Sequence, residues 1–211
     1  MNDGAYSVDP TVVESYTALE PNPFMYGGLQ KNAEDNGFCV KYDGETYPDG
    51  KGTPVKDYQD LVPFHIVRGT LDDEAQVPTS VLANAPYDTI ITSFSLCTAR
   101  NLQESIRSIV RLLKPGGMYI FIEHIRHPPV GDPLVLEDNG VDGRFWGAMQ
   151  GIVNPLWRIL GHGCEVNRHT AQTIDSTSGW ESVEYKYVRI GGDILSYFLP
   201  MTFGKAIKAR E

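Results

Sequence analysis

The fold class depends most on the stretch from residue 87 to residue 124, YDTIITSFSLCTARNLQESIRSIVRLLKPGGMYIFIEH. The β-branched run 89–94 predicts a buried strand, and the run 118–122 predicts a second one. Between them, Asn101 and Glu104 have the spacing of a capping box. Apolar residues then recur at helical spacing, at Leu102, Ile106, Ile109 and Leu113.

We therefore predict a helix over residues 101–114, with Lys114 in its last turn and Pro115-Gly116-Gly117 ending it. A strand, a helix and a second strand, with both strands apolar, are typical of a parallel βαβ unit. The stretch thus indicates an α/β fold.

The rest of the chain adds further elements. Residues 15–19 and 64–68 predict two more strands, and residues 181–189 and 202–208 predict a final pair. Asn22 can cap a helix that begins at Pro23 and ends before Gly37. Residues 41–62 contain clusters of Gly, Pro, Asp and Lys, which predict a surface insertion.

Composition excludes several classes of protein. The length of 211 residues suits a single domain over 1–211, and the net charge of −9 provides no basic surface for nucleic acid. No apolar run approaches the ~18 residues of a membrane span. The three cysteines form no CxxC pair, which favours reduced thiols in a cytoplasmic protein. We expect a small-molecule substrate and neither a nucleic-acid nor a membrane partner.

An ordered series of short motifs carries a family resemblance. It consists of Tyr87-Asp88, Leu113-Lys114-Pro115-Gly116-Gly117, Glu123-His124, Phe145-Trp146, Asn154-Pro155-Leu156-Trp157, Gly163-Cys164 and Asn167-Arg168. The series resembles the class I S-adenosylmethionine (SAM)-dependent methyltransferases, in particular the branch with thiol methyltransferases and type 11 small-molecule enzymes. The resemblance implies a Rossmann-like, mostly parallel sheet with an antiparallel C-terminal strand pair. It also implies SAM as the cofactor and a thiol or hydroxyl group as the methyl acceptor.

The resemblance assigns residues to the cofactor. Glu20, followed by Pro21 and Asn22, matches the acid that ends the family's second strand and binds the ribose hydroxyls; the alternative is an exposed strand-end glutamate. On the adenine side this chain has Thr70 where the family has an aspartate. With a shifted register, Asp72 is expected to take that role and Leu71 to pack on the ring; a plain acidic turn is the alternative. Ser93 ends the fourth strand, at the sheet edge where α/β proteins bind ligands.

The acceptor side is expected in the helical region 145–173. His124 is the candidate general base, and Cys97, Trp146 and Trp157 are the candidate pocket residues. Cys97 is expected to be a small buried residue rather than a nucleophile.

The remaining apolar residues of this region are expected to pack mostly in the core: Phe145, Met149, Ile152, Val153, Leu156, Ile159 and Leu160. His162, Cys164 and His169 do not match a zinc spacing, so no metal site is expected.

One family motif is not found in its usual place. The glycine-rich loop GxGxG should precede residue 15, but residues 1–14 contain one glycine, Gly4. We therefore predict an N-terminally shortened domain whose sheet lacks the family's first strand. The second and fourth strands should then approach each other, with residues 5–13 over the opening, and SAM should bind weakly.

A homodimer or a partner chain is an alternative way to complete the sheet. Two alternative functions follow from weak SAM binding: a partner subunit with the same fold, and a cofactor-independent isomerase or cyclase.

Overall fold

The computed structural model describes residues 12–42, 61–128, 143–188 and 197–210. They form two compact units, one of residues up to Thr70 with Ala75–Asn84, and one of Leu71–Glu74 with the residues from Ala85 onward. The prediction of a single domain over 1–211 stays a prediction. Among the described helices, none is long and apolar enough to cross a membrane.

The first unit contains a parallel three-stranded sheet. Its strand order is β1 (Tyr16–Leu19), β3 (Val62–Val67) and β2 (Phe38–Tyr42). Asn22 accepts a hydrogen bond from the Phe24 N–H at 3.1 Å and caps the 3₁₀ helix η1 (Pro23–Met25), which continues into α1 (Tyr26–Asp35). A second helix, α2 (Thr79–Ala83), follows η2 (Glu74–Gln76). The predicted helix start at Asn22 is confirmed.

Strand β2 was not predicted, and it changes the extent of the predicted insertion. The insertion over 41–62 is wrong at both ends, because Lys41–Tyr42 end β2 and Val62 begins β3. The run FCVKY is too short to predict a strand from its apolar pattern alone. Residues 43–60 lie outside the described residues.

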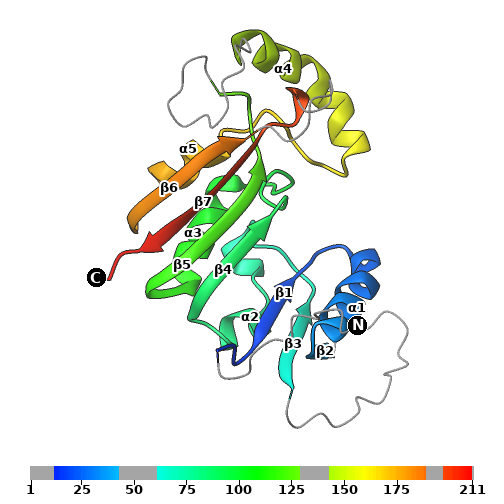
Figure 1. Cartoon of the computed structure of the whole chain (residues 1–211), viewed down its shortest axis with the longest axis vertical. Helices are drawn as coiled ribbons and strands as arrows, with labels where there is room; N and C mark the ends of the chain where they lie inside the picture. Colours follow the sequence, from blue (N-terminus) through cyan, green and yellow to red (C-terminus); the bar gives the residue numbers. More distant parts are fainter. Residues whose placement is uncertain (1–11, 43–60, 129–142, 189–196, 211) are drawn as a thin grey trace, which may run out of the picture. The chain divides into compact units, whose positions relative to one another are not determined.

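The second unit contains a four-stranded mixed sheet. Its order is β4 (Tyr87–Ser93), β5 (Leu113–His124), β7 (Met201–Lys208) and β6 (Trp180–Val188). β4 and β5 are parallel, and β7 is antiparallel to both β5 and β6. Helices α3 (Leu102–Leu112) and α5 (Thr170–Ser176) cover one face of this sheet (Figure 1). The α/β class, the βαβ unit and the antiparallel final pair are confirmed. The predicted burial of the strand over 89–94 is wrong, because β4 has no buried residue.

The helix α3 follows the predicted apolar pattern. Asn101 accepts from the Glu104 N–H at 3.1 Å, but the Glu104 carboxylate pairs with Arg111 at 2.7 Å, so only half of the capping box forms. Ile106 and Ile109 are fully buried, in a core with Tyr119 and Phe121 of β5. This core holds α3 against the sheet.

The chain after α3 differs from the prediction. Lys114 does not belong to the helix: α3 ends at Leu112, and Leu113 is already extended and pairs with Tyr87. Tyr87 of β4 pairs with Leu113, and Thr89 pairs with Met118, so residues 114–117 form a bulge in β5. Gly116 in this bulge has φ +75°. Lys114 Nζ contacts both Asp88 carboxylate oxygens at 2.8 Å. Pairing with β4 therefore ends the helix earlier than Pro115 alone would.

The predicted approach of the second and fourth strands stays a prediction, because the two strands belong to different units. The second strand of the prediction is β1, which pairs with β3, whereas the fourth is β4, which pairs with β5. Each strand finds a parallel partner in its own unit, and this satisfies its backbone groups on that side. Residues 5–11 and any strand formed by them lie outside the described residues.

The helix α4 (Gly143–Leu160) buries its polar side. Gln150 and Asn154 are buried, whereas the larger apolar side chains are exposed by 54–75%: Phe145, Ile152, Leu156, Ile159 and Leu160. The prediction of core packing is therefore wrong for these five residues. The buried amides hydrogen-bond to backbone groups of neighbouring segments, and these bonds fix which side of the helix faces inward.

Replacing Gly204 by alanine should destabilise the second unit. Gly204 lies in β7, and a Cβ there would come within 2.4 Å of the Glu184 carbonyl oxygen and 2.6 Å of the Phe121 ring. We expect a cost of about 1–3 kcal/mol from this overpacking, measured by denaturant unfolding. Gly151→Ala is the matched control, because a Cβ at Gly151 in α4 meets no atom within 4 Å. An equal effect of both substitutions would contradict this packing.

Candidate functional site

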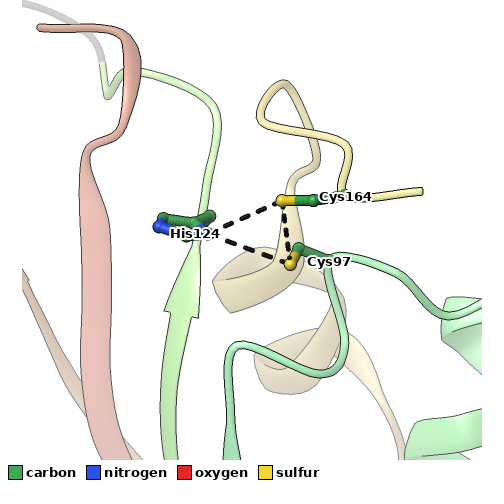
Figure 2. Close-up of side chains that lie close together, drawn as sticks. All are labelled: Cys97, His124 and Cys164. Carbon is green, nitrogen blue, oxygen red and sulfur yellow. Dashed lines mark hydrogen bonds between the residues drawn. The ribbon is translucent and has the colours of Figure 1, made fainter. Parts of the chain in front are cut away.

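Three polar side chains from distant parts of the sequence meet in the second unit. Cys97 follows β4, His124 ends β5 and Cys164 follows α4. The two Sγ atoms lie 3.1 Å apart, and His124 Nδ1 lies 3.6 Å from Cys164 Sγ and 3.9 Å from Cys97 Sγ. Figure 2 shows the three side chains converging. Both cysteines are buried and free, and His124 is half-buried.

A buried carboxylate positions the loop that carries Cys97. Glu123 is fully buried at the end of β5, and it accepts from the Leu96 N–H at 3.1 Å and from the Ser95 N–H at 3.3 Å. Phe94 begins the loop with φ +51°, an uncommon conformation for a residue with a side chain. The Phe94 ring packs on the His124 ring, with centroids 4.6 Å apart.

Amides of α4 position the loop that carries Cys164. Gln150 Nε2 donates to the Val166 carbonyl at 2.9 Å, and Asn154 Oδ1 accepts from the Val166 N–H at 3.0 Å. Gly163 has φ +96°, which lets the chain turn directly before Cys164. The two cysteine loops are joined directly, because the residue after Cys164 donates its N–H to the Cys97 carbonyl at 2.9 Å.

Arg168 adds a second link between the loops. Its Nη1 donates to the Leu96 carbonyl at 3.0 Å and to the Ala99 carbonyl, and its Nε contacts Glu165 at 2.9 Å. The guanidinium lowers the pKa of the Glu165 carboxyl. Both cysteines are thus held by hydrogen bonds to their own backbone segments.

The hydrogen bond between the two cysteines shifts their pKa values in opposite directions. The pKa of Cys164 is lowered to about 5, first by the hydrogen bond with Cys97 and then by the His124 and Trp157 side chains. The pKa of Cys97 is raised, because this hydrogen bond and burial both favour its protonated form. Burial raises the pKa of Glu123, against the opposing effect of its hydrogen bonds to the Cys97 loop. The site therefore combines an acidic thiol, a second thiol and an imidazole.

The structure brings together only some of the predicted acceptor residues. Trp157 packs on the cluster of Cys97, Cys164 and Val166. Cys164 in turn lies beside His124. Trp146 lies elsewhere on α4 and stacks on Tyr197, with centroids 4.7 Å apart. Cys97 is buried as predicted, but it also has an imidazole neighbour that its sequence context did not show.

The predicted cofactor residues fall in both units. Glu20 follows β1 and its Oε1 accepts from the Asn22 N–H at 2.8 Å, while Pro21 is exposed. In the second unit, Leu71 packs on the core and Asp72 Oδ1 accepts from the Ser105 hydroxyl at 2.9 Å. Ser93 is exposed at the end of β4. Their roles toward SAM stay predictions.

Several residues of the site had no assigned role in the sequence analysis: Glu123, Gln150, Cys164, Glu165 and Arg168. As a metal ligand, Cys164 was considered together with His162 and His169, which are both exposed. The signal that could have found the site was the paired Glu123-His124 at the end of a buried strand, near the end of the preceding parallel strand.

The chain is similar to known methyltransferases. It is 26% identical over 133 residues to thiol S-methyltransferase TMT1B of Rattus norvegicus, a match that covers 60% of this chain and 46% of that protein. It is 25% identical over 129 residues to thiol S-methyltransferase TMT1A of Homo sapiens, with the same two coverages. The matches thus span about half the length of these curated relatives. No family model matches the chain.

Solved structures show the same fold. The CurJ carbon methyltransferase has a TM-score of 0.50 at 14% identity, over 96% of this chain and 43% of that chain. The [4+2]-cyclase SpnF has a TM-score of 0.51 at 10% identity, over 95% of this chain and 77% of that chain. The mixed α/β architecture with its antiparallel C-terminal strands agrees with these structures. The chain is thus similar in sequence to curated thiol S-methyltransferases and similar in fold to solved methyltransferases.

Proposed function

We propose that the chain functions in the SAM-dependent methylation of a small-molecule thiol. The observation that carries this proposal is its similarity to thiol S-methyltransferases. The cluster of Cys97, His124 and Cys164 supports it, because it lies at the carboxyl ends of β4 and β5, where α/β sheets bind ligands. A hydroxyl acceptor is the alternative substrate class.

Near the acceptor, the main task of the protein is to remove the proton of the thiol. SAM supplies the methyl group, on a sulfonium sulfur, and a thiol reacts with that carbon as its thiolate. We assign the uptake of the acceptor's proton to the His124 imidazole, which is half-buried at the end of β5. Trp157 is the candidate for packing against the acceptor's apolar part.

Glu20 is our candidate for the ribose of SAM. Its carboxylate stands at the carboxyl end of β1, and the bond from the Asn22 N–H occupies only one of its acceptor positions. A second oxygen and further lone pairs can accept from two ribose hydroxyls, so the residue fits this part of the cofactor.

Calorimetric titration of SAM tests the cofactor assignment. We expect a binding isotherm that saturates at one SAM per chain. No binding at millimolar SAM would contradict the proposal and favour a partner subunit or a cofactor-independent enzyme.

The variant Glu20→Ala should weaken SAM binding by more than about tenfold, because two charge-assisted hydrogen bonds are lost. The same calorimetry measures it. Glu34→Ala, on the exposed side of α1 in the same unit, is the control and should leave the dissociation constant unchanged. Equal affinities of Glu20→Ala and the parent chain would remove Glu20 from the site.

A further inference from the structure

We propose that Cys97, His124 and Cys164 form a binding site for a thiophilic divalent metal ion, with zinc as the first choice. The three donor atoms, two Sγ and Nδ1, all lie within 4.8 Å of one another. Thiolate sulfur and imidazole nitrogen are the ligands that zinc prefers in proteins, and two cysteines with one histidine form a known three-ligand set. This inference does not depend on the proposed methylation.

The distances are close to those of a tetrahedral zinc site. Zn–S bonds of about 2.3 Å and Zn–N bonds of about 2.0–2.1 Å place two sulfurs about 3.8 Å apart and a sulfur and a nitrogen about 3.6 Å apart. The two Sγ–Nδ1 distances are 3.6 and 3.9 Å, already in this range. The Sγ–Sγ distance of 3.1 Å would have to increase by about 0.7 Å, a shift that a small χ1 rotation of either cysteine provides.

Hydrogen bonds fix both loops that carry the cysteine ligands. Glu123 fixes the Cys97 loop through two backbone N–H groups, and Gln150 and Asn154 fix the Cys164 loop. The bond from the Glu165 N–H to the Cys97 carbonyl holds the two loops together. Hydrogen-bonded support of this kind orients the ligands of metal sites before the ion arrives.

Two further observations favour a metal over a plain pair of thiols. A disulfide between Cys97 and Cys164 would use the two sulfurs but would give no role to His124 Nδ1, which faces both of them (Figure 2). Trp157 Nε1 is buried and has no conventional hydrogen-bond acceptor in the described part of the chain. The indole lies against the cysteine cluster, where its N–H suits a sulfur that carries permanent negative charge, as a metal-bound thiolate does.

Only three ligands come from the described residues, so a fourth position is left for water or for an exogenous ligand. A three-ligand zinc site with one open position is the arrangement of catalytic rather than structural zinc. The buried ligands are Cys97 and Cys164, and the half-buried His124 marks the side from which such a ligand can approach.

The test is metal uptake by the full chain, reduced with a phosphine and freed of metal by a chelator. Zn²⁺ is titrated against a chromophoric competitor, and Co²⁺ serves as the spectroscopic probe. We expect one ion per chain and, with Co²⁺, the absorption of a tetrahedral site with two thiolate ligands. Cys97→Ser, His124→Gln and Cys164→Ser should each weaken Zn²⁺ binding by more than about 100-fold. Loss of a residue that only supports a ligand costs about 10–100-fold in metal affinity, and loss of the ligand itself should cost more.

His162→Gln and His169→Gln are the matched controls. Both histidines are exposed and near Cys164 in sequence, and both variants should bind Zn²⁺ like the parent chain. The proposal is overturned if the reduced parent chain takes up no ion, or if the three ligand variants keep its affinity. If a ligand variant fails to fold, the Co²⁺ spectrum of the parent chain tests the site instead. A spectrum that shows fewer than two thiolate ligands overturns the proposal.

Discussion

Replacing Ile106 by alanine should lower the free energy of unfolding by about 2–5 kcal/mol, the range for a large aliphatic side chain removed from a packed core. Ile106 is 0% exposed, at the centre of the α3 face that packs on Tyr119 and Phe121. The substitution removes apolar contacts and leaves a cavity that the rigid sheet cannot close. Denaturant unfolding with a tryptophan fluorescence readout measures the effect.

The matched control is Ile152→Ala. Ile152 also lies in a helix, α4, but it is 72% exposed, so the change should stay within about 0.5 kcal/mol. If Ile106→Ala unfolds at the same denaturant concentration as the parent chain, the α3 face is not part of the core.

Replacing Glu123 by alanine should cost about 2–6 kcal/mol. The carboxylate is fully buried and accepts the N–H groups of Ser95 and Leu96, and each orphaned buried donor costs about 1–3 kcal/mol. The Cys97 loop loses its support at the same time, so the reactivity of the Cys97 thiol toward a thiol reagent should rise. Thermal unfolding and thiol labelling in the native state measure the two effects.

Glu184→Ala is the control for Glu123. Glu184 lies on β6 with its carboxylate 68% exposed, and it contacts Lys205 at 3.4 Å, so its loss should cost less than about 1 kcal/mol. A loss of stability no larger in Glu123→Ala than in this control would show that the buried carboxylate does not hold the loop.

Local patterns were sufficient for the central elements of the fold. The β-branched run 89–94, the helical apolar period of 101–114 and the apolar run 118–122 predicted β4, α3 and β5. α3 and β5 each bury one face, and their sequences reflect that burial, whereas β4 has no buried residue. Asn101 and Asn22 were recognised as caps for the same local reason. These predictions needed no knowledge of distant residues.

The remaining features depend on contacts between distant segments. Lys114 left the helix because Leu113 pairs with Tyr87 of β4, a contact between residues 26 positions apart. The α4 helix turned its apolar side outward because Gln150 and Asn154 bind backbone groups that no helical period reveals. Periodicity shows that a helix has two sides, but the partners of its polar residues decide which side is buried.

The cysteine cluster shows the same limit for the site. Cys97 and Cys164 are 67 positions apart, and their spacing matches no metal or redox motif. Only the parallel pairing of β4 with β5, and the return of the chain after α4, bring the two thiols to His124. The sequence therefore indicated His124 and Cys97 as site candidates, but it did not indicate that Cys164 lies beside them.

The two proposals give His124 different tasks. As a base it accepts the acceptor's proton, whereas with a bound metal ion its Nδ1 is a ligand and the ion itself favours the thiolate form of a coordinated thiol. Comparing methyl transfer by the metal-free and the zinc-loaded chain separates them. If the metal-free and zinc-loaded chains transfer the methyl group at equal rates, His124 is the group that accepts the thiol proton. If transfer requires zinc, the metal ion activates the thiol.

The most direct measurement of the proposed function is the transfer of a labelled methyl group from SAM to a small thiol, followed by mass spectrometry of the thioether. It should be run at millimolar SAM, with the parent chain, His124→Gln and the control His162→Gln. The proposal predicts a labelled thioether with the parent chain and His162→Gln, and a strongly reduced yield with His124→Gln. If the parent chain forms no labelled thioether at saturating SAM, with or without zinc, the chain is not a thiol methyltransferase.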